Sequence, residues 1–288
     1  FAVRSLILRS ENSYTRIQYG FPVLVAGTFT INTFFIVYKG AKFLKLDDTP
    51  LWKACAISFG VGGGSGIFSY FFINPIIFKN EHTLSRQDHF EDGTVQAIHD
   101  NAEQFDARTE YSMRYLQILT ACCDSFAHGA NDVANSIGPF AAIYAIYKSG
   151  KVSKNADMGN DAYWILSLGA TGIVAGLSLY GYKILNALGT KMAKLTPSRG
   201  ICIELGAAAV IILGSRLGWP LSTTHCQVGA TVGVALFEGT GGVNWKLLYK
   251  TIAGWLLTLV VVGSTTAFLF AQGAYAPMVK YPSYVINA

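Results

Sequence analysis

Residues 124–139 interrupt a long, largely apolar region and read Asp-Ser-Phe-Ala-His-Gly-Ala-Asn-Asp-Val-Ala-Asn-Ser-Ile-Gly-Pro. Residues 113–123 before them and 140–147 after them are apolar enough to be buried in lipid or protein. The interval itself holds two carboxylates, two asparagines, a histidine, two serines, two glycines and a proline. Hydrocarbon accommodates such groups only where protein or a water-filled cavity covers them. The stretch therefore predicts a functional site inside a membrane protein.

The composition agrees with that prediction. Of the 288 residues, 51% are hydrophobic and only 14% are charged, and several windows near 20 residues long are almost free of charge. A bilayer demands apolar segments of about 20 residues. The net charge of +5 is spread over loops without an arginine-rich patch, so no nucleic-acid partner is expected. The five cysteines match no zinc pattern. We therefore expect no cofactor and no metal site beyond that of a small, hard cation.

We predict an all-α transmembrane helical bundle in three parts. Residues 1–78 hold two spans, and the glycines between residues 60 and 66 permit close helix packing. Residues 79–112 form a hydrophilic loop that contains a short surface helix and three solvated histidines, His82, His89 and His99. Residues 113–288 form a repeat with two interrupted helical segments. The predicted spans cover residues 19–38, 51–78, 162–185 and 247–270, and the short surface helix lies near residues 95–105.

The first interrupted segment is suited to a small, hard cation. On a helix Asn131 and Asn135 share a face, and Asp132 lies beside it. Their carboxylate and amide oxygens are the ligands that hard cations prefer. Gly129 and the Gly-Pro pair at residues 138–139 mark places where the backbone opens and exposes its polar groups. The alternative is a polar helix–helix contact held by the asparagines.

The second interrupted segment covers residues 214–227, between apolar arms at 200–213 and 228–237. Such arms with a polar tip predict a discontinuous or re-entrant hairpin, and Pro220 favours a new helix start nearby. Ser222, Thr223 and Thr224 are N-cap residue types with spare hydroxyl groups. A helix N-terminus presents free N–H groups and partial positive charge, which suits an oxyanion. The alternative is an ordinary helix cap without a ligand.

These two segments carry a resemblance to the inorganic phosphate transporter (PiT) family. Gly-Ala-Asn-Asp-Val-Ala-Asn at residues 129–135, preceded by Ser-Phe-Ala-His at 125–128, is similar to the signature of that family. Pro-Leu-Ser-Thr-Thr-His-Cys at residues 220–226 resembles its second conserved element. The resemblance covers most of the chain. It implies a sodium-coupled or proton-coupled carrier of inorganic phosphate, built from two inverted repeats with discontinuous helices in a plasma or organelle membrane.

The resemblance also implies roles for single residues, and no catalytic residue is among them. Cation binding falls to Asn131, Asp132, Asn135 and Glu204. Phosphate binding falls to Asp132, Ser222, Thr223 and Thr224. His128 and Gln227 lie in the same motifs and receive supporting roles.

One departure from the family pattern concerns the number of repeats. The family carries the Gly-Ala-Asn-Asp motif twice, and this sequence carries it once. We expect a fragment, a half whose counterpart is a separate polypeptide or a second copy, or a relic that no longer transports. The function expected is cation-coupled phosphate transport as one half of a symporter. The alternative is a non-transporting structural subunit of a larger membrane assembly. An enzyme is not expected, because no nucleophile is paired with a base and an orienting group.

Overall fold

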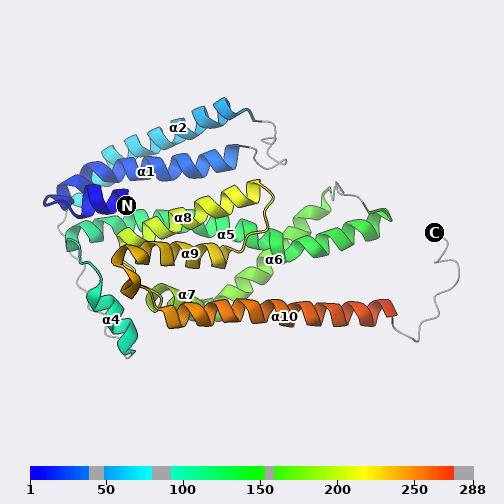
Figure 1. Ribbon diagram of the computed structural model, residues 1–288. Helices are drawn as coiled ribbons and strands as arrows, with labels where there is room; N and C mark the ends of the chain where they lie inside the picture. The colour runs from blue at the N-terminus through cyan, green and yellow to red at the C-terminus, as the bar shows by residue number, and fades with distance from the viewer. Residues whose placement is uncertain (39–48, 80–91, 153–158, 276–288) are drawn as a thin grey trace. The chain divides into compact units, whose positions relative to one another are not determined.

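The computed structural model describes residues 1–38, 49–79, 92–152 and 159–275, and its regular elements in these ranges are helical (Figure 1). The all-α prediction is confirmed. In chain order the elements are η1 (Arg4–Leu8), α1 (Ser13–Val37), α2 (Leu51–Phe68), η3 (Ser69–Ile73), α3 (Asn74–Phe78), α4 (Gly93–Asn101), α5 (Ala107–Ser149), α6 (Asp161–Gly176), η4 (Leu177–Gly181), α7 (Tyr182–Thr190), α8 (Pro197–Arg216), α9 (Thr223–Ala235), η5 (Leu236–Glu238), η6 (Thr240–Gly242) and α10 (Trp245–Tyr275).

The chain divides into two compact units, Phe1–Val243 and Asn244–Ala288. The first contains every helix up to η6, and the second contains α10. Among the described residues, four helical stretches are long and apolar enough to cross a membrane: Leu51–Phe78, Asp161–Thr190, Pro197–Ser215 and Trp245–Ala274. Three of them coincide with predicted spans. The predicted span at residues 19–38 lies largely in α1, which is helical.

Close packing joins α1 to α2. A Cβ atom at Gly62 would lie 2.7 Å from the carbonyl oxygen of Ala26, and one at Gly66 would lie 2.9 Å from the Ala26 Cβ. Because glycine has only a hydrogen atom in place of a side chain, these two positions let the backbones of α1 and α2 approach closely, as expected for small residues between membrane helices. The packing predicted from the glycines is confirmed at these two positions.

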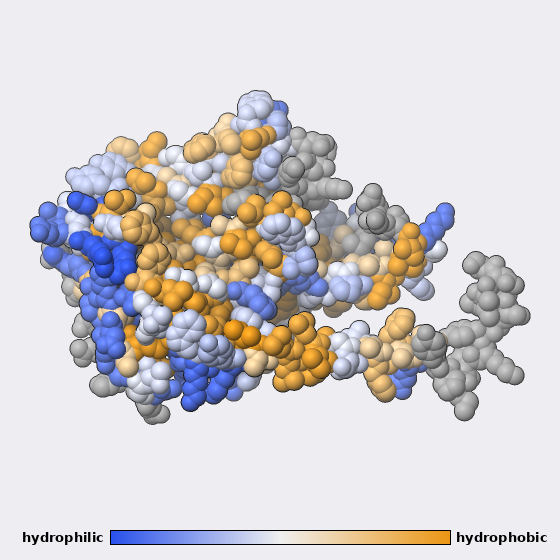
Figure 2. All heavy atoms as spheres, in the orientation of Figure 1, coloured by the Kyte–Doolittle hydropathy of each residue, from blue (hydrophilic) through white to orange (hydrophobic). Residues whose placement is uncertain are grey.

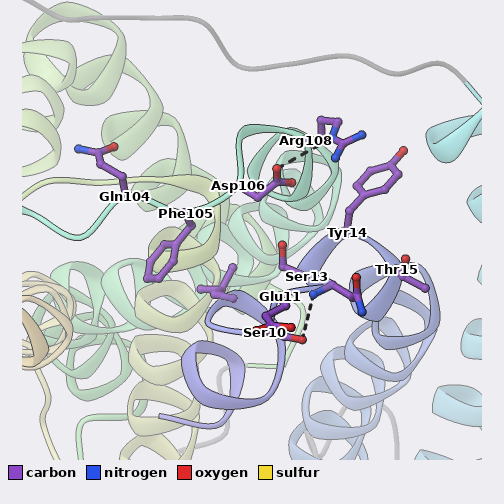
Figure 3. A pocket seen from close by; sticks show the side chains of 11 residues that line it. Ser10, Glu11, Ser13, Tyr14, Thr15, Gln104, Phe105, Asp106 and Arg108 are labelled. Atoms are coloured by element: carbon purple, nitrogen blue, oxygen red, sulfur yellow. Dashed lines mark hydrogen bonds and ion pairs between the residues drawn. The ribbon is translucent and has the colours of Figure 1, made fainter.

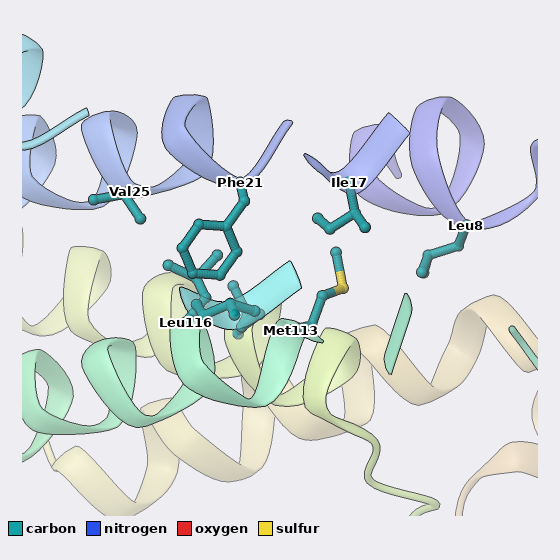
Figure 4. Close-up of a cluster of buried hydrophobic side chains, with 8 residues drawn as sticks. Leu8, Ile17, Phe21, Val25, Met113 and Leu116 are labelled. Atoms are coloured by element: carbon teal, nitrogen blue, oxygen red, sulfur yellow. The ribbon is translucent and has the colours of Figure 1, made fainter. Parts of the chain in front are cut away.

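A hydrophobic core ties α1 to α5 and α8 (Figure 4). Phe21 and Ile17 of α1 face Met113 and Leu116 of α5, and all four are at most 2% exposed. Ile201 of α8 belongs to the same cluster. Burial of such side chains contributes about 1.5–3 kcal/mol each. The core therefore fixes the first half of α5 against its neighbours.

The helix α5 is one continuous element of 43 residues. It starts where the Asp106 carboxylate accepts from the Thr109 N–H (2.9 Å), and it ends at Gly150, whose φ is 66°. The prediction that residues 129–139 break this helix is wrong. Pro139 removes one backbone donor without interrupting the helix. Membrane helices tolerate glycine and proline because neighbouring helices and local adjustments satisfy the freed groups.

The break predicted near residues 214–224 is confirmed. Helix α8 ends at Arg216, Gly218 adopts a φ of 71°, and α9 begins at Thr223. Ser222 caps α9, because its Oγ accepts from the His225 N–H at 3.4 Å. The two helices form a hairpin whose tip is the segment 217–222.

The directions of these helices follow from their contacts. Thr120 contacts Glu204 and Asn131 contacts Ser215, both 84 residues apart, so α5 and α8 run parallel. Helix α9 begins beside Asp132 of α5 and leads to Glu238, which binds Arg199 at the start of α8. It therefore runs antiparallel to both.

Two glutamates join elements at the start of α8 and the end of α9. Glu103 accepts from Arg4 Nε and Arg9 Nε, each at 2.8 Å. Arg199 donates to the Glu238 carboxylate at 2.6 Å and to the Glu103 carbonyl oxygen at 2.9 Å. The Glu103 N–H donates to Glu238 Oε2 at 3.0 Å. We call these five residues the base clasp, and hydrophilic side chains gather at the end of this unit that carries η1 and α4 (Figure 2).

The loop predicted at 79–112 is only partly described. The surface helix expected near 95–105 is present as α4, shifted toward the N-terminus. The prediction that His99 is solvated is wrong, because its Nε2 lies 3.0 Å from the Thr190 carbonyl oxygen in a partly buried contact. The hydrophobic residues Val95 and Ile98 hold α4 against the bundle and bring this histidine with them. His82 and His89 lie outside the described residues.

Candidate functional site

The two predicted polar segments meet at the tip of the α8–α9 hairpin. Asn131 and Asn135 of α5 both donate their side-chain amides to the Leu221 carbonyl oxygen, at 2.9 and 3.1 Å. Ser215, in the last turn of α8, donates to Asn131 Oδ1 at 3.0 Å. A single face of α5 therefore holds both sides of the helix break, as the spacing of the asparagines predicts.

Asp132 connects the same face of α5 to α9. The Thr223 hydroxyl lies 3.0 and 3.1 Å from the two oxygens of its carboxylate. Thr223 is only 4% exposed, whereas the neighbouring Ser222 and Thr224 are exposed. Of the three hydroxyl groups predicted together, one is therefore directed at the carboxylate, and the two beside it are open to a ligand.

Groups that suit a cation and groups that suit an anion lie close together at the helix break. Asn131, Asp132 and Asn135 supply amide and carboxylate oxygens, which suit a hard cation. The start of α9 presents the positive end of the helix dipole, which suits an anion. Among the described residues, no group of three or more His, Cys, Asp or Glu side chains is placed so that it could hold a metal ion.

Glu204 lies apart from this cluster. It is partly buried on α8 and accepts from the Thr120 hydroxyl. Thr120 precedes Asp132 by 12 residues of continuous α5, or about 18 Å at 1.5 Å per residue. The structure thus brings Asn131, Asp132 and Asn135 together and does not bring Glu204 to them.

His128 lies one helical turn before Asp132 on α5, and Gln227 lies one turn after Thr223 on α9. His128 Nε2 is 3.1 Å from Asp124 Oδ1, one helical turn away. Asp124 is only 7% exposed. The sequence prediction did not assign a role to Asp124, although the i, i+4 spacing from a histidine in the same polar stretch is a signal that could have selected it.

A cavity of about 440 Å³ opens beside the cluster. Asn131 and Asn135 line one wall, Ser215, Trp219 and Pro220 of the hairpin line another, and Asn32 of α1 contributes a third. Asn32 was not predicted from the sequence, because it lies in a different helix without a recognisable motif. The cavity gives Asn131 and Asn135 access to the outside of the first unit.

A second hollow of about 400 Å³ lies near the start of α1 (Figure 3). Its wall includes Glu11, Tyr14, Asp106 and Arg108, and the Arg108 guanidinium lies 3.9 Å from Asp106. The Asp106 carboxylate is already used to cap α5. The Asp106 carboxylate in its wall therefore has a structural role at the start of α5, and the hollow contains none of the residues predicted to bind ligand.

Comparison with known proteins gives consistent matches. A model of the phosphate transporter family matches residues 1–266. A phosphate-repressible phosphate permease of Neurospora crassa is 39% identical over 222 residues, which are 75% of this chain and 38% of that protein. A sodium-dependent phosphate transporter of Toxoplasma gondii is 39% identical over 216 residues, which are 65% of this chain and 24% of that protein.

A solved structure described as the sodium-dependent phosphate transporter is similar in fold. Its TM-score is 0.73 at 28% sequence identity, and the match covers 93% of this chain and 59% of that one. This chain therefore spans less than two thirds of the length of each of these relatives.

Proposed function

Because this chain belongs to the phosphate transporter family, we propose that it supplies one half of a cation-coupled carrier of inorganic phosphate. The observation that carries the proposal is the contact between the oxygen ligands of α5 and the hydroxyl-rich start of α9. It is an integral membrane protein with four helices suited to crossing a bilayer in the described part of the chain. Discontinuous helices beside buried carboxylates are typical of secondary transporters.

The cation in this proposal is held by Asn131, Asp132 and Asn135. Their oxygens belong to one face of α5, and the Leu221 carbonyl that fixes the two asparagines lies against that face. We propose Na⁺ as the cation, in keeping with the names of the relatives.

Phosphate in this proposal binds at the start of α9. Ser222 and Thr224 are exposed there, and the first turn of the helix offers its N–H groups. Thr223 joins the two ligands, because its hydroxyl holds the carboxylate that faces the cation. A cation on Asp132 also reduces the repulsion between that carboxylate and the phosphate dianion.

The remaining phosphate donors come from a second repeat in this proposal. Monohydrogen phosphate has several acceptor oxygens, and its transfer from water requires donors for all of them. One helix N-terminus with two hydroxyls satisfies about half of that requirement. A partner carrying the N-terminal repeat provides the rest across a pseudo-two-fold axis.

Reconstitution tests this proposal. We expect no sodium-driven uptake of labelled phosphate by liposomes containing the 288-residue chain alone, and uptake when the N-terminal repeat is added. Ser222→Ala and Thr224→Ala should then reduce uptake. Thr171→Ala is the matched control, because that exposed hydroxyl donates only to its own helix at 2.8 Å.

Two results would contradict the proposal. Uptake by the chain alone would remove the need for a second repeat. No uptake by a folded complete assembly would instead favour the non-transporting structural subunit.

A further inference from the structure

The polar hollow at the start of α1 contains none of the residues assigned to transport (Figure 3). Residues between 8 and 15, at the turn from η1 to α1, line one side, and residues between 104 and 108, which lead into α5, line the other. The Ser13 hydroxyl lies 3.1 Å from the Thr109 hydroxyl and joins the two sides. The volume of about 400 Å³ is within the range of small-molecule sites. The hollow is therefore a candidate binding site in its own right.

The hollow lies level with the end of a membrane span. The Tyr14 ring, which lines it, packs edge-on against the Phe78 ring, with 5.7 Å between the centroids. Phe78 is the last residue of the apolar stretch Leu51–Phe78. Tyrosine is enriched at membrane–water interfaces, where the phospholipid headgroups lie. The hollow therefore belongs to the depth of the headgroups and not to the hydrocarbon.

Two carboxylates in the wall have acceptor oxygens to spare. Glu11 is exposed, and its carboxylate makes no hydrogen bond within the described ranges. Asp106 uses its Oδ2 for the Thr109 N–H and hydroxyl, both at 2.9 Å. Its Oδ1 lies 3.9 Å from Arg108 Nε, which is beyond hydrogen-bond distance. Both carboxylates can therefore accept hydrogen bonds from a cationic ligand.

The same wall carries one positive charge. The Arg108 side chain is 42% exposed, and its guanidinium lies over the Tyr14 ring, 5.1 Å from the centroid. A guanidinium has five N–H donors in its plane and binds phosphate oxygens through them, whereas the ring contact occupies only its face. The hollow thus combines two acceptor carboxylates with one group suited to a phosphate.

We propose that the hollow binds the headgroup of a phosphatidylethanolamine phospholipid. This headgroup joins a primary ammonium to a phosphodiester. The ammonium supplies three donors for Glu11 and Asp106, and the phosphodiester binds Arg108. A choline headgroup has no N–H to offer the carboxylates, and an anionic headgroup without an amine is repelled by them. The inference rests on the membrane location of the chain and does not depend on the proposed transport.

Native mass spectrometry of the purified 288-residue chain tests the site. The chain is released from detergent micelles that contain equal amounts of phosphatidylethanolamine, phosphatidylcholine and phosphatidylglycerol with identical acyl chains. We expect the phosphatidylethanolamine adduct to exceed each of the others by about tenfold, and Glu11→Gln or Arg108→Met to reduce this excess to about twofold or less. Glu11→Lys should shift the preference to phosphatidylglycerol, because the wall then repels an ammonium and attracts an anionic headgroup.

Arg114→Met is the matched control. Its guanidinium belongs to the same helix and donates to the Tyr111 and Tyr115 hydroxyls, at 2.7 and 3.2 Å. Arg114 does not line the hollow, so its substitution should leave the excess of phosphatidylethanolamine unchanged. Asp106 is kept in every variant because its carboxylate caps α5.

Equal adducts of the three lipids on the unmodified chain would overturn the proposal. An excess of phosphatidylethanolamine that survives both Glu11→Gln and Arg108→Met would also overturn it, since the lipid would then bind elsewhere. Soluble glycerophosphoethanolamine separates a lipid from a free ligand of the same chemistry. Failure of this compound to displace the lipid adduct at equal concentration would support the proposal, whereas full displacement would assign the hollow to a soluble ligand.

Discussion

Glu110 and Asp124 are two buried carboxylates on one helix, and their surroundings are opposite. Glu110 accepts from the Ser198 hydroxyl at 2.6 Å and from its backbone N–H at 3.0 Å. Asp124 is as deeply buried, but its Oδ1 makes no hydrogen bond among the described residues and has the His128 ring nitrogen 3.1 Å away. A carboxylate whose oxygens are both hydrogen-bonded fixes the structure around it, whereas one that lacks a hydrogen bond requires a further partner such as water or an ion.

The same contrast separates two larger regions of the first unit. In the base clasp, Glu103 and Glu238 each bind arginine and a backbone or further side-chain group. Toward the hairpin tip, polar groups are held by one or two contacts and border a cavity. We therefore expect the base to serve stability and the region at the hairpin tip to serve binding. Substitutions in the two regions should separate these effects.

The largest effect on stability is expected from Arg199→Met. The side chains of Arg199 and Glu238 are 7% and 12% exposed, so removal of the guanidinium leaves a buried carboxylate without its partner. Breaking such a pair costs about 3–5 kcal/mol. Denaturant unfolding in detergent should show this loss, and Arg199→Met with Glu238→Gln should recover part of it. A loss near zero would mean that the base clasp does not hold the structure.

Asp132→Asn should have the opposite effect to Arg199→Met. We expect a large loss of transport and little loss of stability. A neutral amide keeps one oxygen but removes the charge, and a hydrogen bond to a charged group is worth about 1.5–3 kcal/mol. Sodium-driven phosphate uptake by the complete assembly should fall by about 10- to 100-fold, with a higher sodium requirement. Unchanged sodium dependence would assign Asp132 to the structure instead.

Glu204→Gln tests the boundary between the two regions. Glu204 has the Thr120 hydroxyl as a donor and lies between the base clasp and the hairpin tip along α8. We expect turnover to fall by about tenfold while the unfolding free energy changes by less than about 1 kcal/mol. Thr120→Val is the companion variant, because it removes the donor and keeps the carboxylate. An effect on unfolding larger than that on turnover would place Glu204 with the base.

The smallest expected effect is a loss of stability at low pH. The hydrogen bond from Arg9, followed by contacts with Arg4, holds the pKa of Glu103 below its usual range. A lowered folded-state pKa gives stability that is present above the usual carboxyl range and is lost as the pH falls through the lowered value. Because the pair with Arg9 is partly exposed, we expect about 1 kcal/mol or less. Unfolding measured between pH 7 and pH 3 should show this loss, and Glu103→Gln should flatten it.

The parts of the site predicted correctly from sequence are those set by local chemistry. The Ser222 cap and the glycine beyond α8 define the helix break, and the i, i+4 spacing places Asn131 and Asn135 on one face. The continuity of α5 depends instead on packing around Pro139, which local residues do not report. Asn32 and the pairing of His99 with Thr190 depend on helices distant in sequence.

The length of α5 has a consequence for the electric field across the membrane. Its 43 residues extend about 65 Å, whereas the hydrocarbon core is about 30 Å thick and even a tilt of about 40° accommodates only about 26 residues. Arg108, Glu110 and Arg114 fall in its first turns and Lys148 near its end, so the ends of the helix are suited to the aqueous boundaries. Between residues 115 and 147 the acidic side chains are Asp124 and Asp132. A cation that reaches either one moves charge into the membrane potential, which is worth up to about 2.3 kcal/mol per 100 mV for a full crossing.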